Sequence, residues 1–501
     1  MSRSLPLELA REQERIERMA DGFGLTFFTT VFEIVDYQQM NALAAYQGFP
    51  TRYPHWRWGM EYQQLSKSYE YGLHKIYEMV INNDPTYAYL LEGNPLVDQK
   101  LVMAHVYGHA DFFRNNVYFA HTNRKMVDAM ANHATRVRRI HDAVGVEKAE
   151  RFLDACLSIE DLIDPGAVFR PARKAEPESA RSAEPDGRMP AKTYLDRYVN
   201  PPEYLEERRR RREQAREDAR RFPPSPERDA LGFLLQHAPL EDWERDLLEI
   251  VRDESYYFLP QRQTKVMNEG WASYWHSRMM TRGLLDDSEV IDYADHHSGT
   301  VATQPGRLNP YKLGLELFRD IERRWDKGQF GPEWESCDSM AERAGWDTGA
   351  GQGREKIFEV RRLHADATFL DSFLTRDFCE REGLFVSKTD ARSGKTEVDS
   401  REFDEVKQAL LLHFTNGGRP MIDVVDANYA NRGELLLRHR HLGVDLKMDW
   451  AKEVLENLVR VWKRPVRLET RLGPKALRLA HDGTAPSEEE PGGGKPAPAR
   501  S

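Results

Sequence analysis

Two histidines in the segment LVMAHVYGHADFFRNN have the type and spacing needed for metal chemistry. His105 and His109 stand four residues apart in an apolar run, so a helix places both imidazoles on one face, one turn apart. The same spacing holds zinc in helical metalloproteases, where the pattern is HExxH and its glutamate accepts a proton from water. Here Val106 occupies the position of that glutamate. The pair therefore predicts either a metal site with another proton acceptor or a packed histidine pair without a metal.

A second segment, MNEGWASYWHSRMM, offers further ligands. Two histidines alone do not make a zinc site, because zinc takes three or four nitrogen, sulfur or carboxylate ligands. Glu269 and His276 are seven residues apart and share one face of a predicted helix. The segment is similar to the third-ligand helix of one zinc-metalloprotease class, which implies zinc or another divalent metal on His105, His109 and Glu269, with His276 as fourth ligand or proton carrier. The alternative is a buried hydrogen bond between Glu269 and a histidine that joins two helices.

Other side chains could orient the ligands or replace the missing glutamate. The residues expected to orient the imidazoles are Asp111, Asn268 and Tyr274. The candidate proton acceptors are Asp253 and Glu254 in VRDESYYF, and Glu70 and Glu78 in YEYGLHKIYE. We name His276 and Glu254 as catalytic candidates, although no residue type selects one base among them. For the four-residue spacing of Glu70, His74 and Glu78 the favoured interpretation is an exposed charged stripe.

Composition and charge limit the class of protein. The 501 residues include 31% charged and 40% hydrophobic residues, which is ordinary for a soluble protein. The net charge of −10 argues against general attraction to nucleic acid or anionic membranes. The sequence has no apolar run of about 20 residues and no signal-peptide core near its start, and its three cysteines form no CxxC pair. We therefore expect a cytoplasmic protein that binds no nucleic acid and has no membrane span.

Hydropathy patterning predicts mainly helices with a few strands. Helical spacing runs through FEIVDYQQMNALAAYQGF, YEYGLHKIYEMVIN, the histidine segment, EDWERDLLEIVRDESYYFLP as far as Pro260, and TKVMNEGWASYWHSRMM. The β-prone segments are TYAYLLEG and, around the helical DWAKEVLENLVRVW, MIDVVDANY, GELLLRHRH and PVRLETRL. The predicted organisation is a helical part (1–170), a charged linker or excursion rich in Pro, Arg and Glu (171–230), a second helical part (231–390), a small α+β domain (395–480) and a disordered tail (481–501).

Long blocks of the sequence resemble a known family. They are rich in Trp, His and Asn and follow in order along roughly residues 20–480: HVYGHADFFRNN, TYLDRYVNPPEYLEE, RDESYYFLPQRQTKVMNEGWASYWHS, NPYKLGLELFRDIE and GREKIFEVRRLHADATFLDSFLTRDFC. These blocks are similar to the signature blocks of the SpoVR family, the stage V sporulation protein R type. The resemblance implies a bacterial protein that acts in forming the spore cortex, a peptidoglycan layer. It also implies a partnership with a serine protein kinase system in bacteria that do not sporulate.

The resemblance supplies a process but no reaction, so two functions stay open. The fold expected for both is mainly α with minor β structure (α+β), with a large helical zincin-like domain and a small C-terminal α+β domain. In the first, His105, His109 and Glu269 bind a divalent metal, zinc foremost, and the protein hydrolyses a peptide or amide bond while His276 or a carboxylate moves protons. In the second, a degenerate metalloprotease-like scaffold serves as a non-catalytic regulatory or adaptor protein. The absent HExxH glutamate favours the second function, and the ligand-type residues on two helices favour the first.

Overall fold

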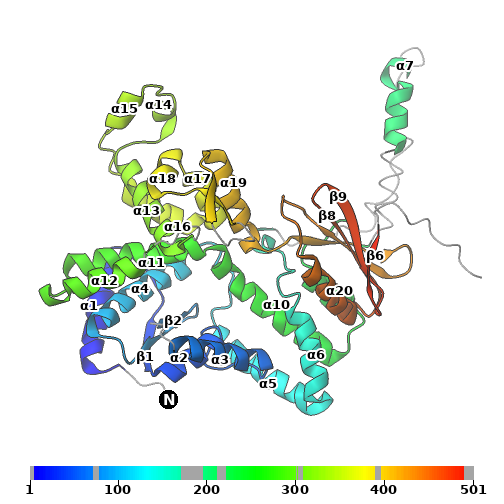
Figure 1. Ribbon diagram of the computed structural model, residues 1–501, viewed down its shortest axis with the longest axis horizontal. Coiled ribbons are helices and arrows are strands. Elements are labelled where there is room, and N and C mark those ends of the chain that lie inside the picture. Colours follow the sequence, from blue (N-terminus) through cyan, green and yellow to red (C-terminus); the bar gives the residue numbers. More distant parts are fainter. Residues whose placement is uncertain are drawn as a thin grey trace, which may run out of the picture. The chain divides into compact units, whose positions relative to one another are not determined.

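The computed structural model describes residues 5–70, 78–170, 196–210, 222–300, 302, 308–389 and 396–489. Within these ranges the chain is mainly helical with small β-sheets (Figure 1), which confirms the predicted α+β class. Two compact units are present, and each combines two separate stretches of sequence: Met1–Val146 with Tyr256–Gly418, and Glu147–Ser255 with Arg419–Ser501. None of the described helices has both the length and the apolar character that crossing a membrane requires.

The first unit consists largely of helices. Its described helices are α1 (Leu7–Gly22), α2 (Tyr37–Ala45), α3 (Trp56–Glu70), α4 (Leu96–Asn115), α5 (Met126–Val144), α11 (Lys265–Met279), α12 (Val290–Thr300), α13 (Pro310–Asp326), α14 (Gly331–Glu335), α15 (Met340–Gly345), α16 (Gly353–Leu363), α17 (Asp366–Phe373), α18 (Arg376–Glu382) and α19 (Phe403–Phe414). A two-stranded ribbon pairs β4 (Val386–Thr389) with β5 (Thr396–Ser400).

A three-stranded sheet precedes the histidine helix. Strand β3 (Thr86–Leu91) lies in its centre, parallel to β1 (Thr30–Val35) and antiparallel to β2 (Glu78–Ile81). Strand β3 confirms the β-prone segment TYAYLLEG, but the helical prediction for FEIV and EMVI is wrong, because these residues belong to β1 and β2. A capping box between Asp36 and Gln39 starts α2 only after β1 has ended. Apolar spacing over so few residues does not separate a short strand from a helix.

Helices α4, α11 and α13 pack closely because glycines lie where they cross. A β-carbon on Gly108 of α4 would lie 2.6 Å from the Cα atom of Ala272 on α11. A β-carbon on Gly270 of α11 would overlap the backbone of Gly314 on α13 and lie 2.8 Å from the amide nitrogen of Leu315. Any larger side chain at these crossings would push the backbones apart. The crossing glycines adjoin the candidate metal ligands, so the close packing brings those ligands within reach of one another.

Helix α10 (Asp242–Gln263) corrects one boundary and leads directly into α11. The prediction that Pro260 ends the helix is wrong, because α10 continues through it to Gln263. A proline one turn from a helix end removes a single backbone hydrogen bond, and here the Thr264 hydroxyl donates to the Pro260 carbonyl at 2.7 Å. The Asp366 carboxylate then caps α11, accepting hydrogen bonds from the backbone amides of Val266 and Met267 at 2.9 Å each.

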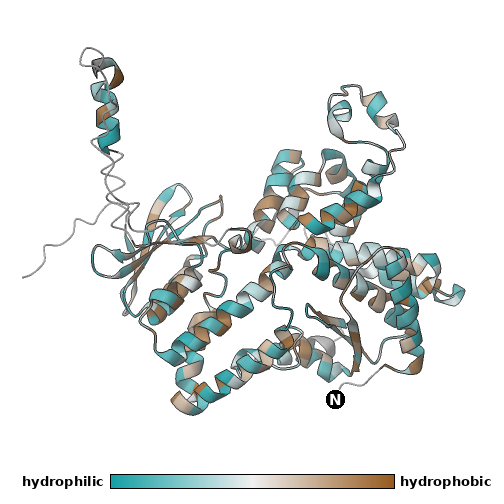
Figure 2. Cartoon of the chain, turned by 180° about the vertical axis from the view of Figure 1, so that it is seen from behind, coloured by the Kyte–Doolittle hydropathy of each residue, from teal (hydrophilic) through white to brown (hydrophobic). Residues whose placement is uncertain are grey.

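The second unit combines helices with a five-stranded sheet. Its described helices include α6 (Val146–Leu157), α7 (Asp196–Val199), α9 (Ala230–His237) and α20 (Met448–Trp462). The strand order is β10 (Pro486–Glu489), β9 (Lys475–His481), β8 (Val466–Leu472), β7 (Glu434–His439) and β6 (Ile422–Tyr429). Strands β7 and β8 are parallel, and α20 forms the connection between them. Bands of brown and teal in Figure 2 show that apolar and polar residues alternate along the helices. In α20 the apolar residues Leu455, Leu458 and Trp462 are buried.

Two predicted segments have only partial structural counterparts. The predicted tail begins at residue 481, yet Pro486–Glu489 forms β10 and pairs antiparallel with β9, whose open edge supplies the backbone hydrogen bonds. Residues 490–501 lie outside the described ranges. Much of the predicted charged linker, residues 171–195 and 211–221, also lies outside them.

Candidate metal centre

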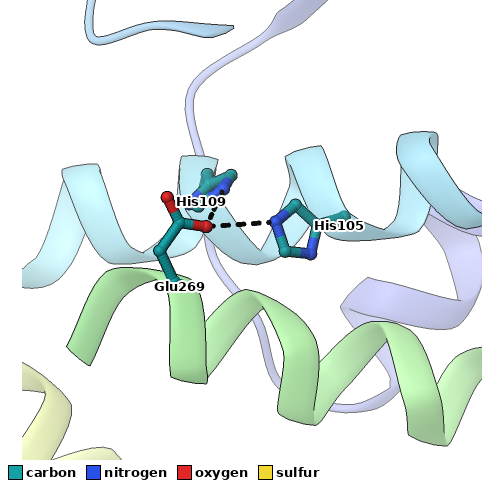
Figure 3. A group of neighbouring side chains, drawn as sticks. All are labelled: His105, His109 and Glu269. Carbon is teal, nitrogen blue, oxygen red and sulfur yellow. Dashed lines mark ion pairs between the residues drawn. The ribbon is translucent and has the colours of Figure 1, made fainter. Parts of the chain in front are cut away.

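The structure brings three of the predicted ligands together between α4 and α11 (Figure 3). The Nε2 atoms of His105 and His109 lie 3.5 Å and 3.6 Å from the Oε2 atom of Glu269. The ligand-type atoms of all three residues lie within 4.8 Å of one another. Both histidines are 5% exposed, whereas Glu269 is partly exposed.

These separations suit ligands around an ion better than hydrogen bonds. A nitrogen–oxygen hydrogen bond is normally about 2.7–3.2 Å long, shorter than both contacts. Ligand atoms of a tetrahedral zinc, at bond lengths of about 2.0–2.1 Å, stand about 3.3 Å apart. The Oε2 atom of Glu269 is buried and has no hydrogen-bond partner among the described residues. A buried carboxylate oxygen without a partner is costly, and a divalent cation would supply what it lacks.

The far nitrogens of the two imidazoles are held by neighbours on α11. The Nδ1 atom of His109 lies 2.9 Å from the Oδ1 atom of Asn268, and the Nδ1 atom of His105 lies 2.9 Å from the Nδ1 atom of His276. With its Nδ1–H donated to Asn268, a neutral His109 turns the lone pair of Nε2 toward Glu269. Burial, and then His105, lower the pKa of His109 to about 4, so this imidazole is neutral near pH 7.

The predicted supporting residues divide into those at the centre and those elsewhere. Asn268 lies where a residue orienting an imidazole should lie, and His276 stands behind His105 rather than among the three ligand atoms. Asp111 makes no hydrogen bond to either imidazole in the described structure. Its carboxylate instead accepts hydrogen bonds from the Trp271 indole and the Thr26 amide, each at 2.8 Å.

Neither Tyr274 nor Glu254 is a member of the ligand group. Tyr274 is buried, and its ring lies beneath the guanidinium of Arg278 at 4.5 Å. Glu254 lies on α10 in the second unit, is 5% exposed, and does not belong to the group formed by the three ligands.

Two residues near the centre were missed or misjudged from the sequence. Tyr311, the second residue of α13, stacks on His105 with ring centroids 6.3 Å apart, and the neighbouring Glu269 carboxylate, burial and Glu78 raise its pKa. Burial raises the pKa of Glu78, against the opposing effect of His105 and with the support of Glu269. The interpretation of Glu78 as part of an exposed helical stripe is therefore wrong, since it is partly buried on strand β2. The side chains of His74 and Glu70 lie outside the described residues.

The candidate proton acceptors are thus unequal in position. Among the candidate proton acceptors, Glu78 lies near enough for its charge to interact with both His105 and Glu269. Val106, which replaces the HExxH glutamate, is fully buried in the hydrophobic core beside Tyr107 and Phe112. No spacing along the sequence relates Glu78 or Tyr311 to the histidine pair, so only the packing of β2 and α13 against α4 could reveal them.

Comparison with known proteins gives the family. The model of the SpoVR like protein family matches residues 5–419, and that of the SpoVR-like C-terminal domain matches residues 420–473. The chain belongs to the SpoVR family. The boundary between the two matches falls within two residues of the division at Gly418 between the two compact units. The second unit also takes in Glu147–Ser255, so it extends beyond the C-terminal family domain.

A curated relative supports this assignment over most of the chain. It is the Escherichia coli K12 protein named "Uncharacterized protein YcgB", which is 29% identical over 481 residues. The match covers 91% of this chain and 90% of the relative. No solved structure matches the chain.

Proposed function

We propose that this SpoVR-family protein is a metal-dependent hydrolase of peptide or amide bonds with a zincin-like centre. The buried His105 and His109 on α4 and the partly buried Glu269 on α11 would hold the divalent metal, with zinc foremost because of the two-imidazole, one-carboxylate set. The observation that carries the proposal is the buried Oε2 atom of Glu269, which has no hydrogen-bond partner among the described residues and lies 3.5–3.6 Å from two imidazole nitrogens. A divalent metal there would polarise a substrate carbonyl and acidify water.

Residues of the chain itself would carry out the remaining work. Asn268 and His276 hold the far nitrogens of the imidazoles, which fixes the orientation of both rings. Glu78 replaces the missing HExxH glutamate as proton acceptor, because it is a partly buried carboxylate whose charge interacts with His105 and Glu269. The Tyr311 phenol, next to the Glu269 carboxylate that raises its pKa, would donate a hydrogen bond to a developing oxyanion.

The expected process fits this chemistry. Formation of a peptidoglycan cortex, which the family resemblance implies, offers peptide and amide bonds as substrates. The sporulation role and the kinase partnership belong to the same proposal.

A non-catalytic role is the second candidate, and one observation favours it. Val106 is packed in the core at the position where a helical metalloprotease carries its glutamate. If Glu78 does not accept protons, the centre could bind a metal without hydrolysing anything. The protein would then act as a regulator or adaptor whose metal stabilises the contact between α4 and α11.

Metal content tests the centre. Elemental mass spectrometry should find about one zinc, manganese or iron ion per purified chain, lost in His109→Ala. His133→Ala is the matched control, since His133 is also 5% exposed but lies on α5. Equal metal content in both variants, or a wild type that binds none of these ions after incubation, would refute the centre.

Activity separates the two candidates. Metal-loaded protein should hydrolyse members of a panel of fluorogenic peptides and muropeptides, and Glu78→Gln should lower the rate by about 10²–10⁴-fold while keeping the metal. If the metal-loaded wild type is inactive on the whole panel, the adaptor role is favoured. If Glu78→Gln keeps full activity, Glu78 is excluded as the base.

A further inference from the structure

A cavity lies between α11, α12 and α13, and its lining residue His297 is close to His276. Its volume is about 300 Å³, and two arginines and two tyrosines line it: Arg278, Arg319, Tyr274 and Tyr293. The remaining lining residues are Ser277, Thr281 and His297. Among the residues that the structure describes, no carboxylate lines the cavity. Each lining side chain can donate a hydrogen bond, so the cavity suits a ligand that accepts several.

The cavity has a buried floor and an exposed rim. Tyr274, Tyr293 and Ser277 on the floor are 1%, 7% and 7% exposed, whereas Thr281 and Arg319 at the rim are exposed. The hydroxyl of Tyr274 is buried and has no partner at normal hydrogen-bond distance among the described residues, although the Glu322 carboxylate is near enough to influence it. Burial, and then the neighbouring Glu322 carboxylate, raise the pKa of Tyr274. A buried donor without an acceptor is a cost that a bound ligand could remove.

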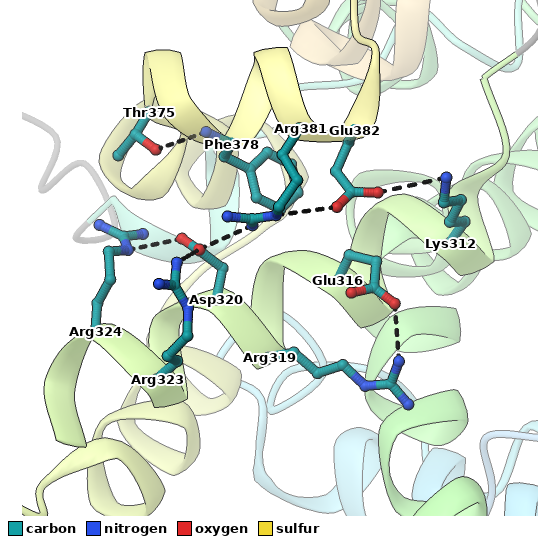
Figure 4. A network of polar contacts seen from close by, with 10 residues as sticks. All are labelled: Lys312, Glu316, Arg319, Asp320, Arg323, Arg324, Thr375, Phe378, Arg381 and Glu382. Atoms are coloured by element: carbon teal, nitrogen blue, oxygen red, sulfur yellow. Dashed lines mark hydrogen bonds and ion pairs between the residues drawn. The ribbon is translucent and has the colours of Figure 1, made fainter. Parts of the chain in front are cut away.

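Both arginines are held in place yet keep donors to spare. Arg278 pairs with Glu322 and lies over the Tyr274 ring at 4.5 Å. Arg319 pairs with Glu316 at 2.8 Å through Nη1, apart from the cluster around Asp320 (Figure 4). A guanidinium has five N–H donors, so each arginine retains donors beyond the one that its glutamate engages. Such forks recognise carboxylates and phosphates.

The cavity adjoins the metal centre without sharing its ligands. His297 lines the cavity, and its Nδ1 atom lies 3.4 Å from the Nε2 atom of His276. His276 in turn contacts His105. Two imidazoles therefore separate the cavity from the ligand group, so binding in the cavity can be tested independently of the metal.

We propose that this cavity binds the anionic group of a small organic molecule, a carboxylate or a phosphate monoester. The donors of Arg278, Arg319 and the Tyr274 hydroxyl would hold the anion. The cavity is large enough for more than a bare inorganic ion, so part of the organic body enters with it.

Isothermal titration calorimetry with the full chain tests the proposal. The probes are phenyl phosphate and benzoate, with the uncharged benzamide as the comparison. Arg319→Gln should weaken binding of the anionic probe about tenfold or more, because one charge-assisted interaction is lost. Arg323→Gln is the matched control: it lies one turn further along α13, pairs with Asp320 three residues earlier, and has 48% side-chain exposure against 44% for Arg319. Its affinity should equal that of the wild type.

A second variant separates binding from folding. Tyr274→Phe removes a hydroxyl that has no hydrogen-bond partner among the described residues, so it should leave the unfolding midpoint unchanged or higher while weakening binding of the probe. Binding of one anionic probe alone identifies the preferred group, and binding of both supports the shared chemistry. The proposal is overturned if neither binds at millimolar concentration, if benzamide binds equally well, or if Arg323→Gln loses as much affinity as Arg319→Gln. It is also overturned if His109→Ala abolishes binding while Arg319→Gln does not, because the anion would then lie on the metal.

Discussion

Substitution of Gly270 by alanine tests the close packing that places Glu269. Gly270 lies at the crossing of α11 and α13, where an added β-carbon would overlap the Gly314 backbone and lie 2.8 Å from the amide nitrogen of Leu315. These neighbours are backbone atoms, so no flexible side chain can move aside. The two helices would have to separate.

The expected magnitude follows from two opposing effects. Overpacking a core costs about 1–3 kcal/mol, and rigid backbone neighbours place this site near the upper limit. Replacing a helical glycine by alanine returns about 1 kcal/mol through helix propensity. We therefore expect Gly270→Ala to lower the free energy of unfolding by about 2 kcal/mol.

A glycine without obstruction provides the control. Gly59 lies inside α3, and nothing stands within 4 Å of its virtual β-carbon. Gly59→Ala should therefore stabilise the protein by about 0.5–1 kcal/mol. Urea unfolding followed by circular dichroism at 222 nm compares both variants with the wild type. If Gly270→Ala is as stable as Gly59→Ala, α11 and α13 do not approach closely enough at Gly270 to exclude a β-carbon.

Two further predictions concern the groups that support the centre. Burial raises the pKa of Asp366 from 3.8 to about 7, against the Val266 and Met267 amides that lower it. The folded pKa exceeds the unfolded one, so the contribution of Asp366 to stability is complete below about pH 4 and is lost as the pH rises through 7, by roughly 4 kcal/mol. Urea unfolding at several pH values should show this loss in the wild type and not in Asp366→Asn. Equal pH profiles for the two proteins would contradict the prediction. Asn268→Leu, which removes the acceptor at the Nδ1 atom of His109, should weaken metal binding about 10–100-fold in a competitive chelator titration, and an unchanged affinity would show that Asn268 does not orient the ring.

Local patterns predicted the elements that depend on neighbouring residues. The HxxxH spacing placed His105 and His109 on one face of α4, because a helix brings residues four apart into line. The strand TYAYLLEG and the strands around α20 also followed from residue type. The same patterning failed at β1 and β2, where apolar residues satisfy either period over so short a length.

The division into compact units shows where a linear view of the chain stops. Each unit combines stretches more than a hundred residues apart, as when Glu147–Ser255 joins Arg419–Ser501. Contacts of this kind depend on which surfaces are complementary after the helices and strands have formed. Hydropathy along the chain marks segments but does not pair them.

The sequence by itself determined the family, the helical class and the residue types of the candidate ligand set on two helices. Tertiary structure alone decided which atoms meet. Gly108 lets α4 approach α11, and this contact brings Glu269 to the two histidines. Tyr311 and the arginine-lined cavity depend likewise on the contact of α13 with α11. The physical reason is that helical periodicity fixes which residues share a face within about one turn. The distance between two helices is set instead by the size of the residues where they cross.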